Sequence, residues 1–236
     1  IEMDTFSFSR LTTYEDCPRR FYYQYIEKLE QKETVPLLLG KAIHAAVECK
    51  IAGDSFESSL IQGMASVDFN PSVPYQDMTF MLGNVPDTIT GETEVYFKIP
   101  LNQKETIFLQ GFIDVVNNTE IIDWKSNRRM FGINDTTQMA LYAYALHELY
   151  GYEEVKARMY FLRFRKESTF VYDQQMMAYA KAWALDLALE IQEQIGRLDF
   201  EYYEHVFLPQ LSSKCSYCPF SVECYQSRCN TVIVSA

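Results

Sequence analysis

The sequence lacks several features that would assign it to a class at once. No apolar run approaches the roughly 20 residues that span a bilayer, and the N-terminus, IEMDTFSFSR, has no basic start followed by an apolar stretch. The chain also has no internal repeat, low-complexity tract or Gly/Ser linker. We therefore expect a cytoplasmic protein without membrane association, in a reducing compartment where disulfides are uncommon.

Positive charge is scarce as well. The 236 residues include 32 Asp and Glu but only 21 Lys and Arg, which gives a formal net charge of -11. This balance is unfavourable for binding a polyanion, because Lys and Arg contacts to phosphate supply most of the non-specific affinity. Local patches can still outweigh the total. With 48% hydrophobic residues, the chain can bury a substantial core, as one large domain or two small ones.

Residues 105–126, ETIFLQGFIDVVNNTEIIDWKS, predict a β-hairpin. Two apolar, β-rich runs flank Asn117-Asn118, and Asn tolerates the positive φ that a two-residue turn requires. With the turn at these residues, Asp114 opposes Ile121. Asp114 and Asp123 then become diagonal neighbours on one face, with β-carbons about 7 to 8 Å apart.

This hairpin face carries the residue types that hydrolyse phosphodiesters. Side chains alternate along a strand, so Lys125 projects to the same side as Asp114 and Asp123. Two carboxylates can hold Mg²⁺ or Mn²⁺, with the backbone carbonyl of Trp124 as a further ligand, and such an ion activates water near neutral pH. Lys125 would orient that water or stabilise the developing charge. The alternative is a buried Asp-Lys ion pair with a second Asp capping a turn.

GFIDVV and EIIDWKS resemble the PD-(D/E)xK nuclease superfamily, specifically its RecB-like branch, whose core motif is an Asp, then an acid, any residue and Lys. LLLGKAIHAAVE, residues 37–48, is similar to the G-x-x-x-H helix of that branch, which implies His44 as a metal ligand. DTTQMALYAYAL, residues 135–146, is similar to its Q-x-x-x-Y helix, which implies that Gln138 and Tyr142 contact the substrate or order the site. Taken alone, His44 is more often structural, Gln138 solvent-facing and Tyr142 a core residue.

Cysteine spacing predicts a second metal centre. CSYCPFSVEC supplies Cys215, Cys218 and Cys224, and YEDCPRRFYYQYI supplies Cys17. A C-x₂-C pair with a third Cys six residues on is ligand spacing. The set is similar to that of iron-sulfur nucleases such as the AddB nuclease domain and CRISPR-associated RecB-like exonucleases, which implies a [4Fe-4S] cluster joining the chain ends. Zn²⁺ is the alternative metal, because four thiolates suit it equally well, and Cys229 is an alternative ligand.

Three further groups of residues are candidates for contacts at the site. Arg128 and Arg129 follow the catalytic strand and are expected to contact phosphates. Glu94, in GETEVYFKIPL, lies on the preceding strand, where the family often has a Glu, although alternation also allows it to face solvent. The aromatic residues Phe21, Tyr22, Tyr23 and Tyr25 could stack unpaired bases, with core packing as the alternative.

The order of apolar patterns indicates the fold class. Expected helices lie at about 9–28 with a restart at Pro18, 37–51, 55–66, 135–150 and 174–197, and expected strands at about 92–101, 105–116, 119–125, 154–164 and 169–173. Residues 67–90 read as a loop with short structure. This order and the resemblance imply an α/β fold, with a mixed central β-sheet flanked by helices in a restriction-endonuclease-like core. We expect a single nuclease domain over 1–236, with a core at about 37–173 and cluster-binding termini at about 9–30 and 205–230.

The combined motifs imply a metal-dependent deoxyribonuclease, specifically an exonuclease that acts on single-stranded DNA ends. One alternative is a non-catalytic nuclease-like module that binds DNA or protein within a recombination or CRISPR adaptation complex. Intact Asp114, Asp123 and Lys125 argue against it. Another alternative is the C-terminal nuclease of a helicase-nuclease, which a start at Ile1 permits, although no helicase motif is present.

Overall fold

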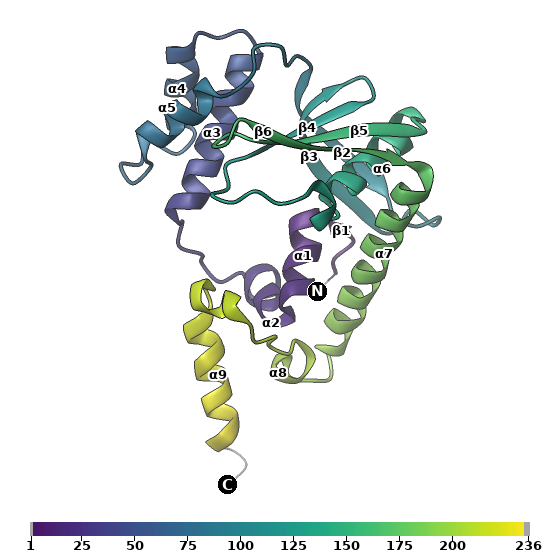
Figure 1. The fold of residues 1–236 in the computed structure, drawn as a ribbon. Coiled ribbons are helices and arrows are strands. Elements are labelled where there is room, and N and C mark those ends of the chain that lie inside the picture. The colour runs from purple at the N-terminus through teal and green to yellow at the C-terminus, as the bar shows by residue number, and fades with distance from the viewer. Residues whose placement is uncertain (1, 234–236) are drawn as a thin grey trace. The chain divides into compact units, whose positions relative to one another are not determined.

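The computed structural model describes residues 2–233, with side chains described to residue 227 (Figure 1). It confirms the predicted mixed α/β fold, in which helices flank a central mixed β-sheet. The chain divides into two compact units, and the single nuclease domain stays a prediction. The first unit comprises Ile1–Lys32, Pro100–Gln110 and Ala182–Ala236, and the second comprises Glu33–Ile99 and Gly111–Lys181. No helix within residues 2–233 is both long enough and apolar enough to cross a membrane.

The second unit contains most of the sheet. Its helices are α3 (Val35–Ile51), α4 (Phe56–Ala65), α5 (Tyr75–Gly83) and α6 (Gln138–Tyr150), with a 3-10 turn at Ile133–Asp135. Its strands are β2 (Glu92–Pro100), β3 (Phe108–Asn117), β4 (Glu120–Lys125), β5 (Glu154–Phe161) and β6 (Lys166–Asp173). The β3-β4 and β5-β6 pairs are antiparallel, β4 and β5 are parallel, and β2 pairs with β3. The sheet is therefore mixed.

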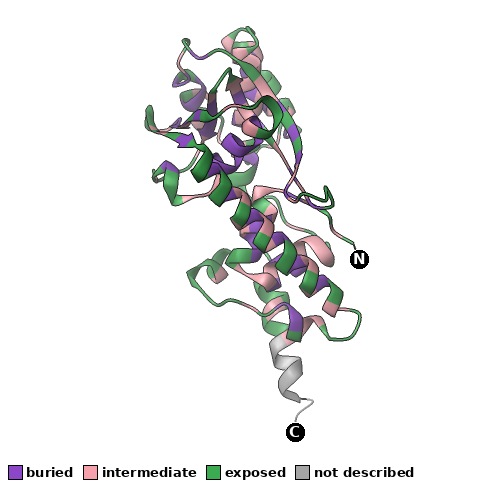
Figure 2. Ribbon diagram, turned by 90° about the vertical axis from the view of Figure 1, so that its right-hand side faces the viewer, coloured by how far each residue is buried: buried purple, intermediate pink, exposed green. Residues whose placement is uncertain are grey.

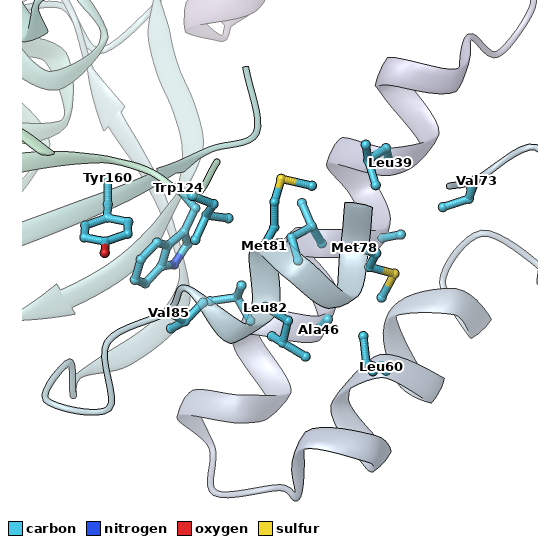
Figure 3. Close-up of a cluster of buried hydrophobic side chains, with 14 of the residues drawn as sticks. Leu39, Ala46, Leu60, Val73, Met78, Met81, Leu82, Val85, Trp124 and Tyr160 are labelled. Atoms are coloured by element: carbon cyan, nitrogen blue, oxygen red, sulfur yellow. The ribbon is translucent and has the colours of Figure 1, made fainter. Parts of the chain in front are cut away.

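A buried apolar cluster packs α3, α4 and α5 against the sheet. Met81 and Leu82 of α5 and Trp124 of β4 belong to it (Figure 3). Each such side chain contributes about 1.5 to 3 kcal/mol when fully buried. Where α4 meets α3, a Cβ atom added at Gly63 would lie 2.5 Å from the carbonyl oxygen of Ala42. Only glycine permits this close approach, which fixes α3 in place.

The region 67–90, predicted as a loop with short structure, contains the nine-residue helix α5. Pro74 is its N-cap, and the prolines at 71 and 86 lie outside it. Met78, Met81 and Leu82 are fully buried, so the helix is stabilised by packing more than by its short sequence pattern. Buried residues alternate with exposed ones along the helices and strands (Figure 2).

The β3-β4 hairpin forms as predicted, but the predicted register is wrong. Asn117 pairs with Glu120, so the turn begins at Asn118, whose φ is 51°. Continued toward the start of β3, this register places Asp114 opposite Asp123, two positions from the predicted partner. The prediction placed both Asn residues in the turn, whereas one residue with positive φ is sufficient here. A shift of two positions preserves side-chain alternation, so the shared face of the two carboxylates does not depend on the turn.

The first unit combines the two ends of the chain. Its elements are β1 (Thr5–Phe6), α1 (Phe8–Asp16), α2 (Pro18–Phe21), a π-helical turn (Tyr22–Ile26), α7 (Gln174–Arg197) from residue 182 on, α8 (Tyr203–Val206), a 3-10 turn (Ser213–Tyr217) and α9 (Ser221–Ile233). The predicted restart at Pro18 is confirmed, because α1 ends before it and α2 begins with it. Strand β1 pairs in parallel with the first residues of β3.

Aromatic side chains and one arginine join these ends. The rings of Tyr22 and Tyr203 stack at 4.4 Å, and Phe21 stacks on Phe207 at 6.2 Å. Arg19 is buried, and its guanidinium donates to the carbonyls of Phe207 and Glu204 at 2.7 and 3.0 Å. Because most of the rings near Arg19 are buried, they are not available for base stacking.

Candidate active site

Side chains from three elements of the second unit bring possible metal ligands together. His44 comes from α3, Glu94 from β2 and Asp114 from β3, and one ligand atom of each lies within 4.8 Å of the other two. Carboxylate oxygens suit Mg²⁺ and Mn²⁺, and an imidazole nitrogen is compatible with Mn²⁺. All three residues line an open pocket of ≈ 560 Å³. The donor set therefore fits a divalent cation that water and substrate can reach.

Asp114 is held by contacts to both of its oxygens. Its Oδ1 lies 3.3 Å from Nδ1 of His44, and its Oδ2 accepts a hydrogen bond from the backbone N–H of Trp124 at 2.7 Å. Burial lowers the pKa of His44, but the charges of Asp114 and Asp123 outweigh burial and raise it to about 9. The Trp124 side chain points elsewhere and packs edge-on against Tyr160 in the apolar cluster.

Glu94 occupies an unusual backbone position. Its φ is 49°, in the left-handed region, although it lies within strand β2. Such a conformation costs about 1 to 3 kcal/mol and is common at functional sites. Burial and then the neighbouring carboxylates of Asp114 and Glu48 raise the pKa of Glu94. Crowding of carboxylates at one point favours a bound cation.

A chain of polar contacts runs from β4 to α6. The Nζ atom of Lys125 lies 2.7 Å from Oδ2 of Asp123 and donates a hydrogen bond to Oε1 of Gln138 at 2.8 Å. Gln138 in turn donates from Nε2 to the hydroxyl of Tyr142 at 3.1 Å. Burial and the Asp123 charge raise the pKa of Tyr142, so its phenol stays protonated. Gln138 and Tyr142 therefore fix the position of the Lys125 ammonium.

Asp123 is the most buried carboxylate of the site, at 4% exposure. Burial raises its pKa, and the Lys125 charge opposes that rise. Its Oδ2 has no aligned hydrogen-bond donor among the described residues, despite the close ammonium. It lies outside the group formed by His44, Glu94 and Asp114. Its role as a metal ligand, and that of the Trp124 carbonyl, stay predictions.

The remaining candidate residues of the second unit lie at its surface. Arg128 and Arg129 are exposed in the segment after β4, so a role in phosphate contact stays a prediction. The sequence alone did not place Glu94 in the site, because it lies twenty residues before Asp114 along the chain. In the structure, the pairing of strand β2 with strand β3 brings the two residues together. A Glu preceding the hairpin was the only sequence signal for it.

In the first unit, the four predicted cluster ligands line one cavity of ≈ 190 Å³. These are Cys17, Cys215, Cys218 and Cys224. Backbone N–H groups of Gln210 and Ser212 donate to the sulfurs of Cys17 and Cys215 at 3.4 and 3.5 Å. Within the described chain, no three of these sulfurs lie within 4.8 Å of one another. Four sulfurs around one zinc would be about 3.8 Å apart, as Zn–S bonds of 2.3 Å require. The side chain of Cys229 lies outside the described residues.

The chain is similar to a known protein family and to two solved structures. The model of the PD-(D/E)XK nuclease superfamily matches residues 5–225. Among solved structures, a protein from Eubacterium rectale described as a candidate exonuclease has 12% identity and a TM-score of 0.57, over 91% of this chain and 87% of that chain. A protein designated SSO0001 has 18% identity and a TM-score of 0.47, over 94% and 86%. No curated protein sequence matches the chain. The first structure shows a shared fold.

Proposed function

Because the chain belongs to the PD-(D/E)XK nuclease superfamily, we propose that it is a metal-dependent DNA exonuclease of the RecB-like branch that acts on single-stranded ends. The observation that carries the proposal is the convergence of His44, Glu94 and Asp114 in an open pocket. The description of the Eubacterium rectale protein as a candidate exonuclease supports the choice of exonuclease. Association with recombination or CRISPR-associated proteins stays a prediction.

Each residue of the site has a distinct task in this proposal. Mg²⁺ or Mn²⁺ held by His44, Glu94 and Asp114 would supply a nucleophilic water and neutralise charge on the phosphate. Lys125 places an ammonium where negative charge develops, and Gln138 holds it by accepting its hydrogen bond. The hydrogen bond from Gln138 to the Tyr142 hydroxyl then fixes the orientation of the Gln138 amide.

Asp123 has one role in this proposal that its contacts support and one that rests on the sequence. Its ion pair with Lys125 keeps the ammonium directed into the site. Its contact to the cation, together with that of the Trp124 carbonyl, stays a prediction, because Asp123 lies outside the group formed by His44, Glu94 and Asp114. Arg128 and Arg129 are exposed beyond β4 and are proposed to contact the phosphates of the bound strand.

We also propose that Cys17, Cys215, Cys218 and Cys224 hold a structural [4Fe-4S] cluster. All four line the same cavity, and backbone N–H groups already donate to two of their sulfurs. Such N–H···S bonds stabilise the thiolate ligands of a cluster and help to set the reduction potential of the cluster. A single Zn²⁺ is the competing occupant of the same four thiolates.

The nuclease proposal is tested with end-labelled single- and double-stranded oligonucleotides in Mn²⁺ or in EDTA. We expect the wild-type protein to shorten the single strand in Mn²⁺ only. Lys125→Ala should reduce the rate about 10²- to 10³-fold, as loss of a charge-stabilising donor does. Lys156→Ala is the matched control, because that lysine is half exposed and pairs with Glu120 on the sheet surface. Equal rates for Lys125→Ala and the wild type would reject the mechanism.

A circular single strand separates the two modes of cleavage. An exonuclease leaves the circle intact, whereas an endonuclease opens it. If the protein binds the linear and the circular single strand and cleaves neither in any divalent metal, the alternative of a non-catalytic binding module holds instead.

A further inference from the structure

Two exposed aromatic side chains lie on the strands that carry the candidate metal ligands. Tyr96 belongs to β2 and Phe112 to β3, and their ring centroids are 5.2 Å apart at an interplanar angle of 49°. They are 51% and 54% exposed, respectively. Single exposed apolar residues are ordinary on a protein surface, but two adjoining rings form a larger apolar patch. This patch is a candidate contact surface.

Its position follows from strand geometry. Tyr96 comes two residues after Glu94, and Phe112 comes two residues before Asp114. Two strand residues span about 7 Å, so the rings begin about one nucleotide step from the candidate metal group. Val95 and Phe97, on either side of Tyr96, are buried. The Tyr96 ring therefore lies on the outer face of β2.

The same alternation brings a positive charge next to the rings. Lys98 is two residues beyond Tyr96 and is exposed. Tyr96 and Lys98 thus lie on the exposed side of β2, and the Glu94 carboxylate precedes them along the strand. A nucleotide strand has the matching succession, with a scissile phosphate at the cation, a base beside it and a further phosphate.

The pocket at the metal group does not itself supply a surface for a base. Its lining consists of aliphatic, charged and small residues, and the one aromatic ring among the described residues that form it is the imidazole of His44, which is a candidate metal ligand. Of the N-terminal aromatics considered for stacking, Phe21, Tyr22 and Tyr23 are at most 9% exposed. A base next to the scissile phosphate would therefore find an accessible pair of rings at Tyr96 and Phe112.

We propose that Tyr96 and Phe112 form a stacking platform for an unpaired base adjacent to the scissile phosphate, and that Lys98 contacts the neighbouring phosphate. The proposal rests on the nuclease function above and specifies its substrate as single-stranded DNA. A base in a duplex is stacked on its neighbours and cannot present its face to these rings. The platform thereby discriminates single strands from duplexes without reading their sequence.

The test measures binding separately from cleavage. A fluorescently labelled single-stranded oligonucleotide is titrated with protein in Ca²⁺, and single abasic positions are moved through the strand. For the wild type, we expect affinity to fall roughly 5- to 150-fold when the abasic position reaches the platform, which is the effect of losing one stacked base. The Tyr96→Ala/Phe112→Ala variant should bind the intact strand with a similar loss and should be insensitive to the abasic position.

Matched controls come from the same chain. Tyr150 is 53% exposed, and its ring lies 5.5 Å from that of Tyr152, so Tyr150→Ala/Tyr152→Ala removes a comparable pair. That pair lies at the far end of α6, about 18 Å along the helix from Gln138. Its removal should leave single-strand affinity and the abasic profile unchanged. Duplex affinity should be the same for all variants, and thermal melting confirms that each is folded.

The outcomes separate this proposal from the nuclease proposal. An abasic position that weakens the wild type and the Tyr96/Phe112 variant equally overturns the platform, even if the enzyme cleaves DNA. Abasic-sensitive binding by a protein that cleaves nothing supports the platform and rejects the nuclease. A Tyr96→Phe variant should retain wild-type affinity, and a large loss in that variant would assign the contact to the hydroxyl instead of the ring.

Discussion

The two aspartates of the hairpin have different environments. Asp114 contacts His44 and the Trp124 backbone, and it faces the open pocket. Asp123 is enclosed and depends on Lys125 for its nearest positive charge. A buried carboxylate that loses its closest counter-charge becomes strongly unfavourable. The stability of the metal-free protein should therefore be sensitive to the Asp123–Lys125 pair.

We expect Lys125→Met to lower the free energy of unfolding by about 3 to 5 kcal/mol without divalent metal, because it leaves the Asp123 carboxylate buried and unpaired. Adding Asp123→Asn in the same chain should recover more than half of the loss, since the charge is then removed. Urea denaturation in EDTA measures both. A double variant that is less stable than Lys125→Met would show that the ion pair is not the cause.

At this scale, the sequence was informative wherever ligands are close along the chain. Asp114, Asp123 and Lys125 lie within twelve residues, and strand alternation alone predicts a shared side. Glu94 was less visible, because its place in the site depends on β2 pairing with β3 and on a positive φ that a Glu does not indicate. The hydrogen bond from Lys125 to Gln138 joins a strand and a helix, so spacing could not predict it.

Among the elements, helix α3 is constrained on two sides. It carries His44 on one side and packs against α4 at Gly63 on another. A Cβ atom at Gly63 would lie 2.5 Å from a backbone oxygen of α3 and 2.8 Å from Cβ of Ala46. Neither atom can move without displacing the whole helix. The contact between α3 and α4 therefore bears directly on where His44 lies.

Gly63→Ala should consequently reduce the free energy of unfolding by about 1 to 3 kcal/mol, the usual range for overpacking. Gly83→Ala is the control, because a Cβ atom there meets nothing within 4 Å. It should be neutral or slightly stabilising, as alanine favours helix. Thermal and urea denaturation of both variants check this. The same stability for both would mean that α3 and α4 approach less closely than described.

The elements also show where sequence patterns were sufficient. Helix α6 ends at Tyr150, as the expected helix at about 135–150 does, and its C-cap Gly151 has a φ of 74°, which glycine adopts without strain. Helix α5 was not predicted because its pattern is short and flanked by prolines, and its stability comes from burial of Met78 and Met81. Local signals thus determined the ends of elements, whereas tertiary burial determined whether a marginal helix forms.

For the molecule as a whole, metal analysis of the purified protein tests directly which metal the four cysteines of the first unit hold. We expect purified protein to be brown and to contain about four iron atoms per chain with matching sulfide, as a [4Fe-4S] cluster requires. Cys17→Ser should lose iron and colour and melt at a lower temperature. Cys49→Ser, on α3 of the second unit, should retain both. Metal analysis that finds one zinc in a colourless protein rejects the cluster.

The net charge of -11 also acts at this scale. A chain with so few cations must bind DNA through a small number of local contacts. Arg19 is not among them, because its guanidinium is buried and hydrogen-bonded. Aromatic stacking is insensitive to the sign of the surface charge, which makes it a suitable source of affinity for an acidic nuclease.

The contacts of Arg19 also affect when the first unit can fold during synthesis of the chain. Its hydrogen-bond partner Phe207 is 188 residues further along the chain. At about 5 to 20 residues per second, synthesis needs roughly ten to forty seconds to reach that partner. During this interval, the apolar rings of Phe21 and Tyr22 have no C-terminal segment to cover them. Helices α1 and α2 are therefore synthesised well before the segment that completes their packing, and until then their apolar rings are exposed to non-native contacts.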